Sequence, residues 1–454
     1  MDASSAFVRP TFAPSEPPPP EIGSAAGRLA RSLFASPLNI VMTFLSAAVI
    51  ALIVPPLVRF LILDATWAGT SRADCLPNAG ACWPFIWAKL GQFIYGFYPV
   101  AERWRPNVVF ALGAALLIPL LVPSAPFKSL TSLLFFGVYP VVSFVLLTGG
   151  NLNLRAFLLG RIVNWESVAG VGTQAGLRWS FWSDFLLCAL LLTGLALIGA
   201  AILRASLRAA FVAMVILFAI LALVFLAVDL DFGLPPVGTR LWGGLLVTLI
   251  VAVTGIVVSL PLGILLALGR RSRLPVIRLF SIVFIEFWRG VPVITVLFFA
   301  TYMLPLFLPR GFTFDTFLRV LVGVALFSAA YMAEVVRGGL QAIPRGQYEA
   351  AEAVGLGYWR TMGLVILPQA LTLVIPGIVN NFIGLFKDTT LVLIVAIFDL
   401  LGQLRASFSD PNWSTPVTLY TGFAFAGMIY FAFCFAMSRY ALFIERRVQA
   451  SGQR

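Results

Sequence analysis

The sequence predicts an all-α membrane protein, a multi-pass helical bundle of about ten spans. The 454 residues are 60% hydrophobic and only 11% charged, and their mean hydropathy is +0.97. The apolar residues form continuous runs, and a run of about 18 residues can cross the hydrocarbon core as a helix. Backbone polar groups must be satisfied internally in lipid, so only helices or a closed barrel can span it. Continuous rather than alternating runs favour helices.

The expected spans follow the apolar runs. They lie at 38–63, 107–124, 133–148, 182–203, 209–230, 241–268, 285–308, 317–337, 363–385 and 418–441. The segment 84–100 contains Lys89 with prolines and glycines, so an interfacial or re-entrant segment is expected there. Residues 1–36 are rich in Pro, Ser and Ala, a composition typical of a disordered tail.

A polar stretch at 231–240 divides the chain. We expect a transmembrane extension with an outward loop at 37–235, a second transmembrane part at 236–445 and a short cytoplasmic tail at 446–454. Charges near or inside spans become frequent only after the division, so function is expected in the second part. They are Glu286, Arg289, Glu334, Arg337, Lys387, Asp388 and Asp399.

The net charge of +12 predicts an orientation rather than a nucleic-acid partner. The basic residues fall in short loops such as 269–273 and at 444–448, without clustered exposed aromatics. Cytoplasmic loops carry such an excess, so both termini are expected in the cytoplasm. The loop at 102–106, which contains Arg103 and Arg105, then lies outside, against this rule.

The four cysteines fall into two classes. Cys188 and Cys434 lie inside apolar runs, where cysteine packs as a small hydrophobe. Cys75 and Cys82 lie in a polar loop that the orientation places outside, where a disulfide can persist. A disulfide is the prediction, and two reduced cysteines are the alternative. The loop lacks a second ligand pair for zinc, so no metal site is expected.

Residues 344–360, PRGQYEAAEAVGLGYWR, form a polar segment between two apolar runs. Pro344 and Gly346 end the preceding helix, and Gly355 and Gly357 end a short helix of good helix formers. Glu349 and Glu352 share one face, and alanines leave the remaining surface with little bulk. This suits close docking into a cleft of another protein. A solvated, glycine-capped loop helix is the alternative.

The spacing of this segment resembles the EAA motif of ABC-importer permease subunits. The matching residues are Glu349, Ala350, Ala351, Gly355, Leu367 and Pro368, with Val365 where the family usually has Ile. Arg289-Gly290-x-Pro292 and the run Lys387 to Leu391 resemble permeases for polar amino acids, the histidine/glutamine permease-like family. The extension, with its ADC…ACW loop and YPVAERWRP, resembles the larger permease of a general L-amino-acid importer.

The resemblance implies a five-span importer core at 236–445, with the EAA loop at 341–368 acting as the coupling helix. It implies a bacterial inner-membrane subunit that moves L-amino acids by alternating access. The implied partners are ABC ATPase subunits, a second, related permease and a periplasmic amino-acid-binding protein. ATP and Mg would be bound by the ATPases, because none of the three lysines here follows a glycine as a P-loop requires. The chain contains no histidine, so no catalytic site is expected.

The charged residues near the spans suggest a substrate path. The candidates are Lys387, Asp388, Thr389, Thr390, Glu286 and Arg289. A lysine, a carboxylate and hydroxyls suit both ends of a zwitterion, and 387–402 is expected to be a broken or re-entrant element. Glu334 and Arg337 can pair at their three-residue spacing, which Glu286 and Arg289 share. The alternatives are a structural tie at a helix break and pairs that brace span ends.

Three other functions compete with this hypothesis. An ion-coupled secondary transporter would need inverted repeats and intramembrane carboxylates, and no repeat is evident between the halves. A membrane enzyme would need catalytic groups. An ABC permease for another small polar solute would share every feature except the cargo.

Overall fold

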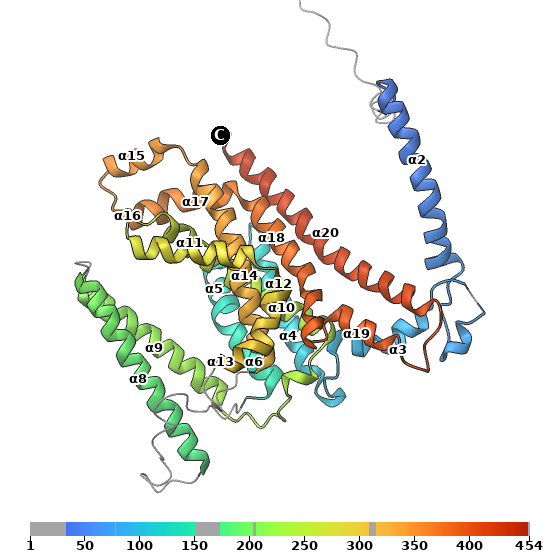
Figure 1. The fold of residues 1–454 in the computed structure, drawn as a ribbon, viewed down its shortest axis with the longest axis horizontal. Coiled ribbons are helices and arrows are strands. Elements are labelled where there is room, and N and C mark those ends of the chain that lie inside the picture. Colours follow the sequence, from blue (N-terminus) through green and yellow to red (C-terminus); the bar gives the residue numbers. More distant parts are fainter. Residues whose placement is uncertain (1–32, 78, 151–172, 203–205, 308–314, 453–454) are drawn as a thin grey trace, which may run out of the picture. The chain divides into compact units, whose positions relative to one another are not determined.

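The computed structural model describes residues 33–77, 79–150, 173–202, 206–307 and 315–452 (Figure 1). The chain forms two compact units. One comprises the residues up to Pro84 together with Thr415–Thr421, and the other comprises Phe85–Ser414 with Gly422–Arg454. Most of the predicted tail at 1–36 lies outside the described residues.

The first unit contains α2 (Pro37–Val58), which continues as a π-helical turn to Leu63, and a disulfide-closed loop. The Ser36 hydroxyl accepts a hydrogen bond from the Asn39 N–H and caps α2. The structure joins Cys75 to Cys82, with Cα atoms 5.6 Å apart. The Cys82 N–H donates to the Thr421 hydroxyl at 2.9 Å, so the loop is held against the start of α20 (Thr418–Gly452).

The second unit begins with the rest of the extension. Its elements are α3 (Trp83–Tyr95), which enters this unit at Phe85, η3 (Val100–Glu102), α4 (Trp104–Leu121), α5 (Lys128–Leu133), η4 (Leu134–Val138), α6 (Tyr139–Thr148), α8 (Thr173–Ile202) and α9 (Leu207–Asp229). Arg105 at the start of α4 is fully buried. Its Nη2 lies 2.7 Å from Glu102 Oε2, and Nη1 donates to the Pro235 carbonyl at 2.8 Å. This arginine of the 102–106 loop is therefore a structural tie.

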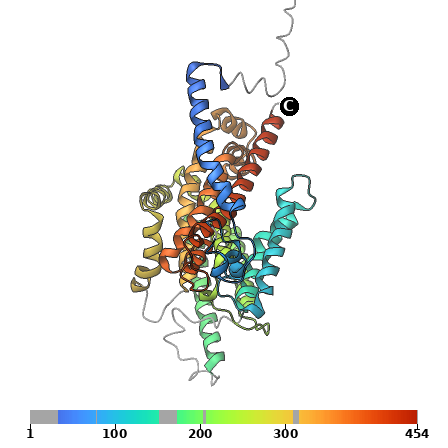
Figure 2. The same cartoon turned by 90° about the vertical axis from the view of Figure 1, so that its right-hand side faces the viewer.

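The core continues from residue 239. Its helices are η6 (Thr239–Leu241), α10 (Gly244–Arg270), α11 (Pro275–Gly290), α12 (Val293–Phe298), η7 (Phe299–Met303), α13 (Leu304–Phe307), α14 (Thr316–Ala342), α15 (Arg345–Ala353), α16 (Tyr358–Arg360), η8 (Thr361–Ile366), α17 (Leu367–Leu373), α18 (Ile375–Asp388), η9 (Thr389–Val395), α19 (Leu400–Ser407) and α20. The helices α10 and α14 lie side by side at its centre and run parallel, since Trp242 packs on Phe317 at their starts and Arg270 bonds to Glu334 near their ends (Figure 1; Figure 2). Small residues on α14, including Ala329, Ala330 and Ala333, are fully buried and allow this close packing.

Nine helices in the described residues are long and apolar enough to cross a membrane, or ten if one bent pair counts as a span. That pair corrects the predicted span 285–308. Its first helix, α11, begins at Pro275 and ends at Gly290, and the chain bends by 103° before α12 begins at Val293. The sharp turn occurs at Gly290-Val291-Pro292, because proline lacks an N–H and restricts the residue before it.

The predicted span 363–385 is also corrected. The chain breaks at Val374, before Pro376, and the qualifying segment is Ile375–Val395. Lys387 and Asp388 therefore fall inside a candidate span, rather than opening a separate re-entrant element at 387–402. The predicted cytoplasmic tail at 446–454 stays a prediction, because the candidate span ends at Arg447. With no proline to stop it, α20 continues to Gly452.

Candidate functional site

The EAA segment folds as the short helix α15, followed by α16 and η8. One side faces the protein: Ala351 is buried, and Tyr348 packs against an apolar cluster centred on Met332 and Ile366. The other side is open, because Glu349 and Ala350 are exposed. The alternation follows from helical geometry, since residues three or four apart share a face. The helix therefore offers a small-residue, acidic face to whatever covers it.

Gly355 ends α15 with a backbone that other residues rarely adopt. Its φ is +76°. The Leu356 N–H reaches the Ala351 carbonyl at 3.0 Å, and the Gly355 N–H reaches that of Glu352 at 2.9 Å. These two bonds form a Schellman motif, which needs the left-handed conformation that glycine tolerates. A Cβ here would meet no atom within 4 Å, so a substitution would be resisted by the backbone and not by packing.

The rest of the motif joins α15 to the following helix. Leu367 is partly buried against the same apolar cluster, whereas Pro368 is exposed in the first turn of α17. The Gln369 amide donates to the Gln347 side-chain oxygen at 3.1 Å. The two halves of the EAA loop therefore pack on each other.

A second attachment connects α15 to the end of α10. Arg271 Nη1 donates to the Tyr348 hydroxyl at 3.0 Å and to the Leu340 carbonyl at 3.2 Å. The same guanidinium lies over the Tyr348 ring, 5.5 Å from its centroid. A cation held by a hydrogen bond and a ring face has little freedom to move independently. We call this part of the core the α15 end.

The neighbouring Arg270 belongs to an ion-pair cluster. Glu334 accepts from Arg270 and from Arg337, each at 2.8 Å. Arg289 Nη1 lies 3.9 Å from Glu334, and Glu286 pairs with Arg270 at 2.9 Å. The Glu334–Arg337 pairing occurs as predicted, whereas Glu286 and Arg289 each pair with another helix. The cluster fastens α10, α11 and α14 together beside α15.

The other predicted path residues lie towards the opposite end of α10. Lys387 and Asp388 are exposed on α18. The Thr389 hydroxyl donates to the Phe386 carbonyl at 2.8 Å, and that of Thr390 donates to the Lys387 carbonyl at 2.9 Å. The structure therefore divides the predicted set into two groups.

The group from Lys387 to Thr390 has neighbours that the sequence did not predict. The Tyr430 hydroxyl on α20 donates to Asp399 Oδ2 at 2.9 Å and lies near the Thr389 and Thr248 side chains. Asp399 caps α19 by accepting from the Gly402 N–H at 2.9 Å. Burial raises the pKa of the Asp399 carboxyl, and these donors oppose the rise. The signal available in the sequence was Tyr430 in the middle of the apolar run 418–441, which also contains Tyr420 and Tyr440.

We call the part of the core formed by α19, Asp399 and the start of α10 the α19 end. The Gly244 N–H at the start of α10 donates to the Phe398 carbonyl at 2.9 Å, and the Leu400 N–H donates to Thr248 at 3.0 Å. Groups of three or more residues able to hold a metal are absent from the described chain.

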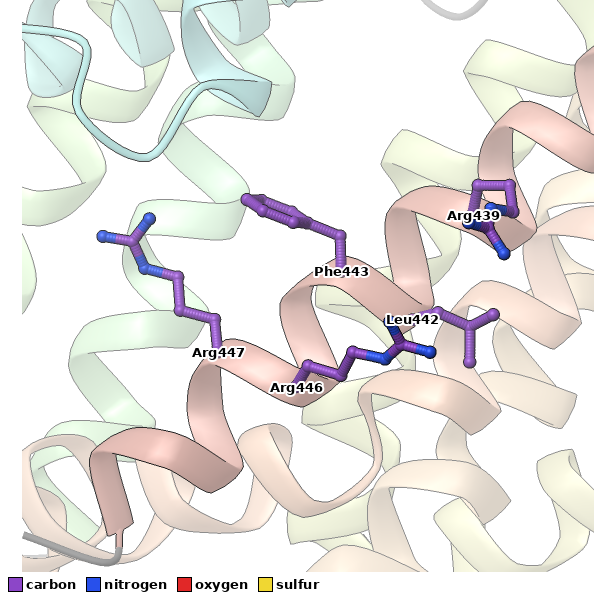
Figure 3. Close-up of a pocket in the computed structure, with 5 residues that line it drawn as sticks. All are labelled: Arg439, Leu442, Phe443, Arg446 and Arg447. Atoms are coloured by element: carbon purple, nitrogen blue, oxygen red, sulfur yellow. The ribbon is translucent and has the colours of Figure 1, made fainter. Parts of the chain in front are cut away.

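A shallow hollow lies along the last turns of α20 (Figure 3). Its lining is Arg439, Leu442, Phe443, Arg446 and Arg447, all from one helix. The Tyr440 hydroxyl donates to the Leu121 carbonyl at the end of α4 at 3.1 Å. The hollow is a basic surface groove at the helix end and not an enclosed site.

Comparison with known proteins identifies the family. Residues 259–450 match the family model described as binding-protein-dependent transport system inner membrane component. The inner membrane amino-acid ABC transporter permease protein YhdY of Escherichia coli is 40% identical over 95% of this chain and 96% of its own. The chain belongs to the amino-acid ABC transporter permeases. It is therefore a multi-pass inner-membrane transport subunit without an ATPase domain of its own.

Two further relatives differ in length. The glutamate/glutamine/aspartate/asparagine transport system permease protein BztC of Rhodobacter capsulatus is 40% identical over 98% of this permease and 99% of its own chain. The probable glutamine ABC transporter permease protein GlnP of Bacillus subtilis is 32% identical over 46% of this permease and 93% of its own chain. A permease of about half this length thus exists in the same family.

Proposed function

We propose that this permease imports acidic amino acids and their amides, and that α15 is the helix through which partner ATPases drive it. The cargo follows from BztC, whose name gives glutamate, glutamine, aspartate and asparagine and which aligns along nearly the whole chain. The observation that supports coupling to the ATPases through α15 is the difference between its two sides. Its inner side is tied to Arg271 and Gln369, and its Glu349 side is exposed.

The α15 end faces the cytoplasm in this proposal, so both termini do as well. Basic residues concentrate there, as expected for cytoplasmic segments. They include Arg270, Arg271, Arg273, Arg278, Arg345, Arg360, Arg439, Arg446 and Arg447. The α19 end and the disulfide loop then face outward, where a periplasmic binding protein delivers cargo. ATP and Mg are bound by the ATPases.

The motion of α15 is transmitted to the membrane spans. When the ATPases close, α15 moves, and Tyr348 moves Arg271 at the end of α10 with it. Arg270 is the adjacent residue on the same helix, and it is bonded to Glu334 and Glu286. A displacement of α15 therefore reaches α10, α11 and α14 through two consecutive arginines, and these helices alternate between outward and inward access.

The path uses both polar groups. Glu286 and Arg289 border its cytoplasmic part, and Lys387, Asp388, Thr389 and Thr390 its outer part. A zwitterion with an acidic side chain needs a cation for each carboxylate and an acceptor for its ammonium group, and each group contains both. A second, related permease subunit completes the path opposite the exposed Lys387 and Asp388, since unpaired charges in lipid are costly.

The test is co-purification and uptake. The tagged chain is extracted from its own membranes in mild detergent, and the co-purifying subunits are identified and assayed for ATPase activity. We expect a P-loop ATPase in comparable amount and, in proteoliposomes with the binding protein, uptake of labelled glutamate that excess aspartate or glutamine inhibits and leucine does not. A chain that purifies alone, or uptake blocked equally by leucine, contradicts the proposal.

A further inference from the structure

The helix α3 belongs to the extension, yet it packs on the core at the α19 end. Its last turn is followed by Gly96, which forms a backbone bridge with Trp242 just before α10. A Cβ on Gly96 would lie 2.4 Å from the Gly243 Cα. That distance is shorter than carbon atoms tolerate, so only glycine permits this approach. The backbone of the extension therefore touches the backbone of the core.

Side chains of α3 reach two further core segments. Lys89 Nζ lies 2.5 Å from Asp410 Oδ2, in the connection from α19 to α20. The Gln92 amide donates to Gln403 Oε1 on α19 at 3.1 Å, and Gln403 is fully buried. A buried polar group that loses its partner is costly, so this contact fixes α3 against α19.

Aromatic side chains of α3 also pack on the core, in addition to these polar contacts. Phe85 and Phe93 of α3 are both fully buried. The Phe85 ring centroid lies 6.4 Å from those of Phe408 and Trp413, and the Phe93 centroid lies 5.9 Å from that of Phe425. These separations are ordinary for packed rings. The contacts thus join α3 to α19, to the 408–414 segment and to α20.

We propose that α3 is a fixed brace that holds α10, α19 and the 408–414 segment together as one body at the α19 end, so that the outer end of the path moves as a unit. The role rests on the proposed function, in which the core spans tilt during import. The α19 helix is only eight residues long, and isolated helices of that length are unstable in water. The brace supplies the packing that keeps it in place while the spans around it move.

The first test reverses and then restores the Lys89–Asp410 pair. In K89D two carboxylates face each other, and we expect uptake to fall about fivefold, while the amount of assembled complex and its basal ATPase activity stay within about twofold. The swap K89D/D410K should return uptake to within about twofold of wild type. Arg240 supplies the matched control, because it is exposed at the same end and has no ion pair among the described residues. R240D should leave uptake unchanged.

The alternative is that α3 is a lid that must separate from α19 during the transport cycle. In that case, a cross-link between α3 and the 408–414 segment would keep uptake low. In the pair K89C/D410C, the brace predicts low uptake that a short bifunctional thiol reagent restores by joining the two segments. D410C alone, treated with the same reagent, should stay low. Uptake that stays low after cross-linking of the pair, or unaltered uptake in K89D, overturns the brace.

Hydrogen exchange gives a readout that needs no cargo. In the detergent-purified complex, K89D should raise backbone amide exchange at 400–414 several-fold and leave α15 unchanged. Exchange at 400–414 equal to that of wild type overturns the brace. If wild type fails to import glutamate while exchange responds as expected, the proposed cargo fails and the brace stands.

Discussion

The α15 end and the α19 end of the core use the same kinds of side chains in opposite ways. At the α15 end the motif carboxylate of Glu349 is exposed and Arg271 reaches across to a separate helix. At the α19 end Asp399 and Gln403 are fully buried and satisfy neighbouring backbone or side-chain groups. The α15 end exposes its motif carboxylate, whereas the α19 end encloses Asp399 and Gln403. In the proposed function, the motion of the ATPases enters at the α15 end, and the α19 end resists local opening.

Within the second unit, the extension and the core also differ in how much of their spans is buried. More than half, 56%, of the most apolar window of α14 is buried, whereas only 6% of that of α9 is. A span whose surface is almost wholly exposed is positioned by lipid rather than by packing. In the extension, α9 therefore contributes little to the core, whereas Val109 on α4 and Leu147 on α6 share a buried cluster with Trp242 and Leu246.

The largest effect is expected at Gly355. In G355D the backbone must leave the left-handed region, so the Schellman end of α15 is lost and its exposed face is displaced. We expect uptake and cargo-stimulated ATPase activity to fall at least about thirtyfold, the loss of a major interface contact, with normal amounts in the membrane. G357A is the control, since Gly357 is outside the left-handed region. Normal transport by G355D would show that α15 does not couple.

The next largest effect is expected at Glu334, whose removal leaves three arginines facing one another. E334A should lower the free energy of unfolding of the purified complex by about 1.5–3 kcal/mol, the range for hydrogen bonds to charged groups. E334Q retains the shape and should cost less. The measurement is thermal unfolding in detergent at fixed salt. A loss in E334A no larger than in the exposed-site variant R273A would mean that the cluster contributes nothing measurable.

A smaller effect is expected at Tyr348, where the contact and not the fold is removed. Y348F loses the hydroxyl that Arg271 binds but keeps the ring beneath the guanidinium, and it should lower amino acid imported per ATP hydrolysed about threefold. Y348A should lower it further, and R273A should leave it unchanged. A fall in uptake matched by an equal fall in ATP hydrolysis would argue against transmission through this pair.

Local spacing made the α15 end predictable. Glu349, Ala351 and Gly355 lie within one short segment, so their faces and the glycine stop follow from helix geometry alone. The span positions were harder to predict. Hydropathy averages across the break at Val374 and merges the end of α11 with α12, because the residues on both sides of each break are apolar. Gly290 and Pro292 indicate the turn, but a prediction from continuous apolar runs does not take them into account.

Contacts between distant parts of the sequence could not be predicted. Arg271 and Tyr348 meet because α10 and α14 run parallel, so that the end of α10 lies beside the end of α14, which α15 follows. Lys89 and Asp410 are 321 positions apart and meet because α3 packs on the core. Nothing local to Lys89 distinguishes a brace from an interfacial helix. The buried state of Arg105 was hidden for the same reason, since its carbonyl partner lies at Pro235.

The smallest effect is an expected insensitivity to pH at the α19 end. The Lys89 ammonium and the Asn412 N–H hold the pKa of the Asp410 carboxyl below its ordinary value. A carboxyl with a lowered folded-state pKa contributes stability that is fully present above the ordinary value of about 4 and is lost only as pH falls through the lowered one. The ratio of D410N to wild-type uptake should therefore stay constant between about pH 5 and about pH 8. A ratio that approaches one near pH 5 would mean that Asp410 protonates there, so that the ion pair with Lys89 is weaker than its geometry indicates.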